Sequence, residues 1–203
     1  KRVVAQLLDK GRVSPVWLGL GGQDLDQRLA VYFGLREVRG MLVTEVFRDT
    51  PAHASGLTAG DVILSVDGVA VEDKEHYLEI LRNFVNDEAV DLEVLRQGRQ
   101  MKLQARAASF TRDLAVALAV SRWGLEVTED GRRGAGLGLT ALTRSGPAER
   151  LGLRPGDRVL KIGGLLMDSL DDYVLAVSRY RMQNTVLLVV ARGGKAYYVR
   201  LQL

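Results

Sequence analysis

Residues 50–61 read TPAHASGLTAGD, and residues 146–157 read GPAERLGLRPGD. The two segments share Pro, Ala, Gly, Leu and a final Gly-Asp at matching positions, 96 residues apart. The same offset, without a gap, pairs Arg96-Gln97-Gly98 with Arg192-Gly193-Gly194. A period of this length is too long for the repeating unit of a solenoid. The sequence therefore predicts two domains, each with its own hydrophobic core.

The first copy shows how each domain should be built. Thr50 can cap a short helix, Pro51 suits its first position, and Gly56 can end it in a left-handed conformation. The surrounding pattern predicts an extended segment, a strand, a longer helix and a hairpin, at Gly40–Val46, Val62–Val66, Lys74–Val85 and Val90–Ala105. We expect a strand-rich α+β fold: two partly open β-barrels or sandwiches, each with about two helices.

The composition excludes several classes of function. The chain has 203 residues, a net charge of +3, two His and no Cys, so disulfides, thiolate zinc sites and a thiol nucleophile are excluded. Two isolated His residues argue against a metal site, and we expect no cofactor. No apolar run reaches the ~18 residues of a membrane span. The Arg residues are dispersed and few aromatics lie among them, which argues against binding to nucleic acid.

Catalysis by this chain is also not expected. A serine hydrolase needs a nucleophile, a base and an orienting acid. His53 aligns with Glu149 in the second copy, and His76 falls within a predicted helix. No Gly-x-Ser-x-Gly motif is present. We therefore predict that the chain carries no catalytic triad and is not itself an enzyme.

The repeated Pro-Ala, Gly-Leu and Gly-Asp signature resembles the core signature of bacterial PDZ domains. The resemblance predicts one PDZ domain at residues 14–105 and another at residues 122–203. Residues 106–121 contain no Pro or Gly, so we expect them to form a linker helix. Residues 3–13 (VVAQLLDKGRV), followed by Trp17-Leu18-Gly19-Leu20, are similar to the junction between the protease and first PDZ domains of HtrA/Deg serine proteases. By this resemblance, residues 1–13 are the tail of a protease domain or a linker helix, and the chain is expected to be a fragment.

The PDZ resemblance implies a binding site in the first domain. PDZ domains take a peptide as an added strand beside a helix, and backbone amides hold its C-terminal carboxylate. The loop Leu18-Gly19-Leu20 is expected to supply those amides. Leu78 and Leu81, on the predicted helix, are expected to line the pocket for the last side chain of the ligand.

The corresponding site in the second domain is less regular. The expected loop is Trp123-Gly124-Leu125, and Val174 and Val177 lie 96 residues after the two helix leucines. Gly136-Leu137-Gly138-Leu139 resembles a PDZ carboxylate loop, but the repeat places Gly136 opposite Gly40, at the start of the next strand. The first copy also carries an extra helical pattern at Leu25–Gly34, whereas a similar pattern at Phe110–Val120 precedes the second loop. Two interpretations of the second groove remain open, competent or closed.

The resemblance implies a peptide-binding regulatory module of an HtrA/Deg-type serine endopeptidase. Its expected ligands are polypeptide C-termini or unfolded segments, and its expected partner is a protease domain on its N-terminal side. A homo-oligomer formed through that protease domain is compatible with this hypothesis. The expected setting is protein quality control in the bacterial periplasm or cell envelope. The alternative is a non-proteolytic PDZ scaffold or adaptor in secretion or envelope assembly.

Overall fold

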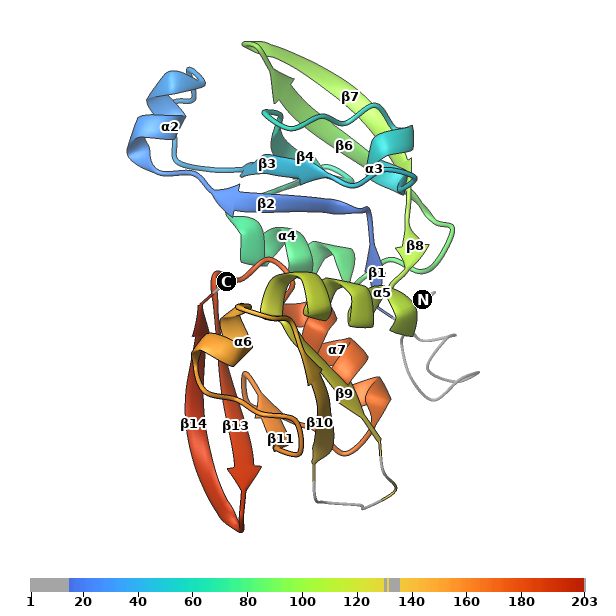
Figure 1. Ribbon diagram of the computed structural model, residues 1–203. Coiled ribbons are helices and arrows are strands. Elements are labelled where there is room, and N and C mark those ends of the chain that lie inside the picture. Colours follow the sequence, from blue (N-terminus) through green and yellow to red (C-terminus); the bar gives the residue numbers. More distant parts are fainter. Residues whose placement is uncertain (1–14, 130, 132–135, 203) are drawn as a thin grey trace. The chain divides into compact units, whose positions relative to one another are not determined.

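The computed structural model describes residues 15–129, 131 and 136–202 (Figure 1). The chain divides into two compact units between Ser109 and Phe110. The protease tail or linker helix expected at residues 1–13 lies outside the described residues. In the part of the chain that is described, none of the helices is long and apolar enough to cross a membrane.

Unit 1 is built on a six-stranded antiparallel sheet with strand order β2-β3-β4-β6-β7, in which β5 also pairs with β4. Strands β1 and β8 form a separate two-stranded sheet. The elements are β1 (Val16–Trp17), β2 (Leu20–Asp24), α2 (Gln27–Tyr32), β3 (Met41–Val46), α3 (Pro51–Ala54), β4 (Val62–Val66), β5 (Val69–Ala70), α4 (Lys74–Leu81), β6 (Ala89–Arg96), β7 (Arg99–Arg106) and β8 (Ala108–Ser109).

Unit 2 repeats this topology with strand order β14-β13-β11-β10-β9, and β12 pairs with β11. The elements are α5 (Arg112–Leu118), the π-helical turn η1 (Ala119–Trp123), β9 (Leu125–Thr128), β10 (Leu137–Leu142), α6 (Pro147–Arg150), β11 (Arg158–Ile162), β12 (Leu165–Leu166), α7 (Leu170–Tyr180), β13 (Thr185–Arg192) and β14 (Lys195–Gln202). The strand-rich α+β class is confirmed, and neither sheet closes into a barrel.

Local backbone chemistry explains the turns and the short helix. Gln97 and Gly98 have φ of 50° and 76°, which gives the hairpin β6–β7 a turn whose twist matches its strands. The Thr50 side chain accepts a hydrogen bond from His53 N, and Pro51 is the first residue of α3. These positions agree with the prediction from the repeated signature.

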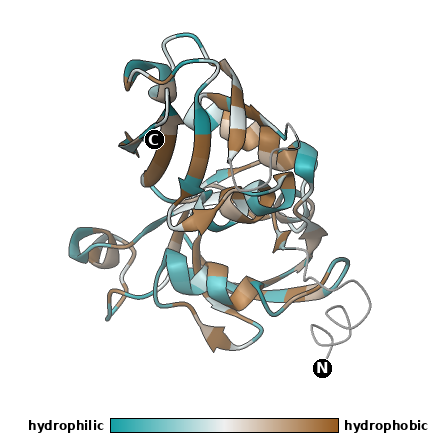
Figure 2. Ribbon diagram, turned by 90° about the horizontal axis from the view of Figure 1, so that it is seen from below, coloured by the Kyte–Doolittle hydropathy of each residue, from teal (hydrophilic) through white to brown (hydrophobic). Residues whose placement is uncertain are grey.

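The helix α4 and the segment after it contribute buried side chains to the core of unit 1. Tyr77, Leu81 and Phe84 are buried, as expected for one face of the predicted helix. Apolar segments run through the strands of both units (Figure 2). The helix ends at Leu81 rather than Val85, because the amides of Asn83 and Phe84 turn back to carbonyls three residues earlier.

The linker helix expected over residues 106–121 differs from the structure. Arg106 ends β7, and β8 pairs with β1 through Trp17 opposite Ala108. The helix α5 begins only after Thr111, whose side chain accepts a hydrogen bond from Leu114 N. It belongs to unit 2, where Arg112 Nη2 lies 3.4 Å from Asp171 Oδ1 of α7. The segment is therefore divided between the two units and does not form a separate connector.

Candidate functional site

The candidate site of unit 1 lies along the outer edge of β2. Among the described residues, β2 pairs only with β3, with Leu20 opposite Val46 and Gln23 opposite Leu42. Its other edge faces α4 (Figure 1). An unpaired strand edge beside a helix is the arrangement to which an extended peptide can add as a further strand.

The loop before β2 turns its carbonyl groups into the unit. Leu18 O accepts from Ala52 N at 2.7 Å, and Gly19 O accepts from Phe47 N at 3.0 Å and from Thr50 Oγ1 at 3.2 Å. In a trans peptide group the N–H points away from its own carbonyl, and no cis peptide bond occurs among the described residues. The amides of Gly19 and Leu20 therefore point away from α3 and β3.

These two adjacent amides point outward at the same end of β2. In the part of the chain that the structure describes, no acceptor takes a hydrogen bond from Gly19 N. Consecutive backbone N–H groups that converge in a loop can hold a carboxylate without a charged side chain. The partners of the carbonyls, Ala52 N and the Thr50 hydroxyl, were not found by sequence reasoning, although the repeat had marked the helix cap at Thr50.

Gly19 is required by the shape of this loop. Its φ is +86°, a conformation that favours glycine. A Cβ at this position would lie 2.2 Å from Thr50 Cβ. Any substitution of Gly19 would displace Thr50 and rebuild the loop, so loss of binding in such a variant would not separate charge from structure.

The four expected leucines of unit 1 frame the same edge. Leu18 and Leu20 flank Gly19, while Leu78 and Leu81 come from α4, which lies beside β2. All four side chains are buried. The structure thus places the loop residues and the helix residues on the two elements that border the open strand edge.

The second loop occupies the equivalent place in unit 2. Thr143 N donates to Gly124 O at 2.9 Å, just as Phe47 N, 96 residues earlier, donates to Gly19 O. Gly124 therefore corresponds to Gly19. Gly136 has φ +76° and precedes β10, as Gly40 precedes β3. The structure agrees with the rejection of the loop-like Gly136–Leu139 segment.

The amides of the second loop are used differently. Gly124 N donates to Ala119 O at 2.9 Å, because η1 runs directly into the loop. Gly124 N, the equivalent of Gly19 N, is therefore already paired, whereas the Leu125 amide points away from β10. The sequence signal was the helical pattern at Phe110–Val120, which comes immediately before this loop.

The remaining residues expected at the site of unit 2 are buried or half-buried within that unit. The Trp123 side chain is 1% exposed, and its ring lies edge-on to Tyr173 at 6.5 Å. Burial, together with the charge of Glu126, raises the pKa of Tyr173. Val177 is buried and Val174 half-buried on α7, which also packs against α5. The second groove thus keeps the strand edge and the helix but has fewer free amides.

Comparison with known families agrees with this geometry. Profiles described as "PDZ domain" match residues 16–106 and residues 140–192. Together these matches cover more than half of the chain, and each falls on one of the two units. The chain belongs to the PDZ domain family and contains two such domains.

Relatives described as serine endoproteases match along nearly the whole chain. A probable periplasmic serine endoprotease DegP-like from Ectopseudomonas mendocina is 29% identical over 218 residues, covering 100% of this chain and 46% of the relative. Its counterpart from Pseudomonas fulva is 30% identical over 220 residues, covering 99% and 45%. The HtrA-type protease AlgW, solved with a decapeptide, aligns to 53% of this chain and 33% of its own with 32% identity and a TM-score of 0.45. The chain spans about half the length of the curated relatives it matches.

Proposed function

We propose that unit 1 binds the C-terminal end of a polypeptide by strand addition to β2. The observation that carries this proposal is the outward direction of the Gly19 and Leu20 amides at the end of an unpaired strand edge. The ligand carboxylate would accept from these amides, and the ligand backbone would continue antiparallel to β2. The main chain supplies most of the affinity in this mode, and the side-chain pocket supplies the specificity.

The pocket favours an apolar final residue. The four side chains expected around the last ligand residue, those of Leu18, Leu20, Leu78 and Leu81, are all apolar. Burying an apolar ligand side chain against them would contribute about 1.5–3 kcal/mol. A charged final side chain would lose its hydration without a partner among these four residues, so the site discriminates against it.

Unit 2 is proposed as the weaker site. Its loop keeps the Leu125 amide, but the Gly124 amide is already paired with Ala119 O. Loss of one amide donor to a carboxylate removes a charge-assisted hydrogen bond, which is stronger than a neutral one. Val174 and Val177 are also smaller than the leucines they replace.

In the longer protein, we propose that this pair of PDZ domains recognises substrates and regulates an HtrA/Deg-type serine endopeptidase of the periplasm. The match to DegP-like relatives over nearly the whole chain supports this role. The chain itself would contribute recognition and no catalysis. Exposed C-termini and unfolded segments are the ligands that such a role in protein quality control requires.

The experiment uses one apolar-ended peptide in two forms, with a free C-terminal carboxylate and with a C-terminal amide. Fluorescence anisotropy of the labelled peptides gives the Kd of each form for the wild-type chain. Amidation removes the charge of the ligand carboxylate and so weakens its hydrogen bonds to the two amides. We expect the amidated peptide to bind about 10- to 100-fold more weakly. Equal affinity of the two forms would contradict carboxylate recognition, and binding of neither form would contradict the site.

A further inference from the structure

A carboxylate joins β2 to α4 at the end of the proposed groove opposite the Leu18–Leu20 loop. Asp24 is the last residue of β2, and its Oδ1 accepts from Lys74 N, the first amide of α4, at 2.8 Å. Its Oδ2 lies 3.8 Å from Lys74 Nζ, whose side chain is 9% exposed. Asp24 of β2 is thus bonded to Lys74, the first residue of α4, 50 positions later in the chain. This interaction between Asp24 and Lys74 is called the tie below.

Unit 2 contains an equivalent hydrogen bond, which is formed by different residues. Glu129 directly follows β9, and its Oε2 accepts from Leu170 N, the first amide of α7, at 3.2 Å. Leu170 lies 96 residues after Lys74, and it carries no charge. The feature common to both units is therefore the bond between a carboxylate at the strand end and the first amide of the helix.

This bond is separate from the helix cap. Asp73 caps α4 by accepting from His76 N at 2.8 Å, and Ser169 caps α7 by accepting from Asp172 N. A cap satisfies amides of its own helix and starts the helix. Asp24 instead satisfies another of the unpaired amides at that terminus from a different element, where a negative charge is also favoured by the helix dipole.

We propose that Asp24 is a positioning residue, which fixes the separation between β2 and α4 and closes the upstream end of the groove. This inference rests on the proposed function of unit 1. A ligand whose last residue lies at Leu20 and which runs antiparallel to β2 reaches Asp24 after about four residues. The tie therefore limits strand addition to the last residues of the ligand and holds the groove at the width that they need.

The first test compares Asp24→Ala with Asp73→Ala. Both variants remove a carboxylate acceptor from the start of α4, but only Asp24→Ala disconnects α4 from β2. With the free-acid peptide, Asp24→Ala should raise Kd about tenfold, whereas Asp73→Ala should bind within about twofold of wild type. Asp24→Asn keeps an acceptor for Lys74 N and should restore most of the affinity. Equal Kd values for Asp24→Ala and Asp73→Ala would overturn the proposal.

The second test needs no ligand. Because the chain has no Cys, the exposed positions of Gln23→Cys and Glu79→Cys can carry nitroxide labels on β2 and α4 without side reactions. Electron paramagnetic resonance should show a broader range of label separations when Asp24→Ala is added, and an unchanged range with Asp73→Ala. An unchanged range of label separations with Asp24→Ala would show that Asp24 does not fix the distance between β2 and α4. Failure of the wild-type chain to bind peptide, with the broadening present, would instead reject the proposed function alone.

Discussion

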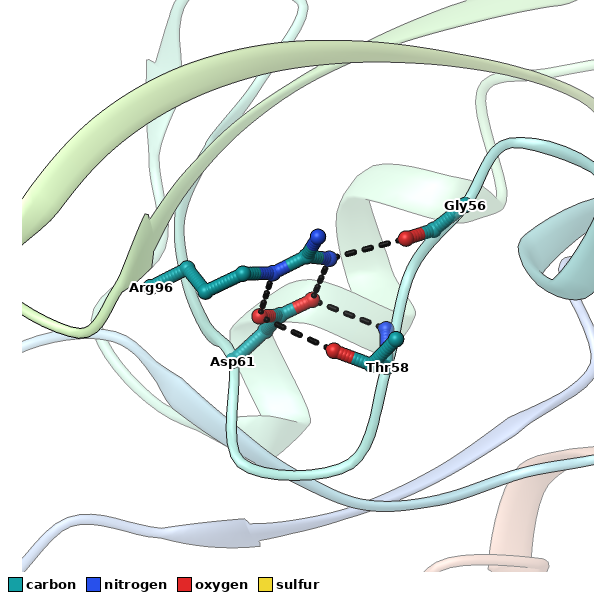
Figure 3. A network of polar contacts seen from close by, with 4 residues as sticks. All are labelled: Gly56, Thr58, Asp61 and Arg96. Carbon is teal, nitrogen blue, oxygen red and sulfur yellow. Dashed lines mark hydrogen bonds and ion pairs between the residues drawn. The ribbon is translucent and has the colours of Figure 1, made fainter.

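The Arg96 guanidinium donates two hydrogen bonds, of 2.6 and 2.7 Å, to the carboxylate of Asp61, whose side chain is 1% exposed (Figure 3). Arg96 also donates to Gly56 O at 2.8 Å, and Asp61 accepts from Thr58 N at 2.9 Å. The network joins β6 to the segment between α3 and β4. It recurs in unit 2 between Arg192 and Asp157 with the same distances, which explains why the repeat preserves Asp and Arg 35 residues apart.

Removing Arg96 should destabilise unit 1. Arg96→Met leaves a buried carboxylate without its cation, and breaking such a pair costs about 3 kcal/mol. The chain has two Trp residues, one in each unit, so a Trp123→Phe background leaves Trp17 to report urea unfolding of unit 1. The matched control is Lys102→Met, which removes an exposed ion pair with Glu93 and should change little. Equal effects of the two substitutions would show that the buried pair does not stabilise unit 1.

Unit 2 should lose stability in acid through Asp157. The hydrogen bond from Arg192 is the main cause that lowers the pKa of Asp157. A carboxylate with a folded-state pKa below its unfolded value, about 3.9, stabilises fully above that value and loses the contribution as the pH falls through the folded pKa.

Urea unfolding of the Trp17→Phe variant, followed by Trp123 at pH 7, 4 and 3, measures this loss. Adding Asp157→Asn removes the titrating group, so unit 2 should be less stable at pH 7 and less sensitive to acid below pH 4. The same dependence on pH with and without Asp157→Asn would rule out this carboxylate as the cause.

The Thr50 hydroxyl should contribute to ligand affinity through the loop. Its single proton is shared between Phe47 O at 2.7 Å and Gly19 O at 3.2 Å, and the contact with Gly19 O helps to direct the next amide outward. Thr50→Val keeps the shape of the side chain and removes the hydroxyl, which should raise Kd for the free-acid peptide about fivefold. Thr50→Ser retains the hydroxyl and should bind close to wild type. If the Val and Ser variants bind equally well, the hydroxyl has no role in orienting the loop.

The two loops should bind the same peptide with different affinities. Trp17 lies two residues before Gly19, and Trp123 lies one residue before Gly124. The fluorescence emission of each Trp therefore reports peptide binding at the loop beside it. In the Trp123→Phe variant, emission should saturate at low peptide concentration. In the Trp17→Phe variant, it should require about tenfold more peptide, because Gly124 N is already paired. Similar midpoints in the two variants would contradict the proposed ranking.

Much of the fold could be predicted because its signals are local. Gly56 and Gly98 take positive φ, Pro51 begins a helix, and each requirement is expressed within a few residues of sequence. The repeat then showed that these signals form two copies of one topology. The register also separated the loop at Gly124, which comes just before β9, from the similar segment at Gly136, where β10 begins one residue later.

The details that decide the site depend on distant partners. Whether the Gly124 amide is free depends on a π-helical turn that reaches back to Ala119, which periodicity could not distinguish from an ordinary helix end. The bond between Asp24 and Lys74 joins residues 50 positions apart, so no local pattern announces it. The helix α5 was expected in a linker because its partner, α7, lies far along the chain.

In the proposed function, the Gly19 and Leu20 amides hold the carboxylate of the ligand. The most direct measurement is a proton–nitrogen correlation spectrum of the assigned wild-type chain during titration with the free-acid peptide. We expect both amide protons to move downfield on binding, and we expect the amidated peptide to produce no such shifts at the same concentration. Unchanged Gly19 and Leu20 resonances at saturation, with the perturbed amides elsewhere, would contradict this proposal.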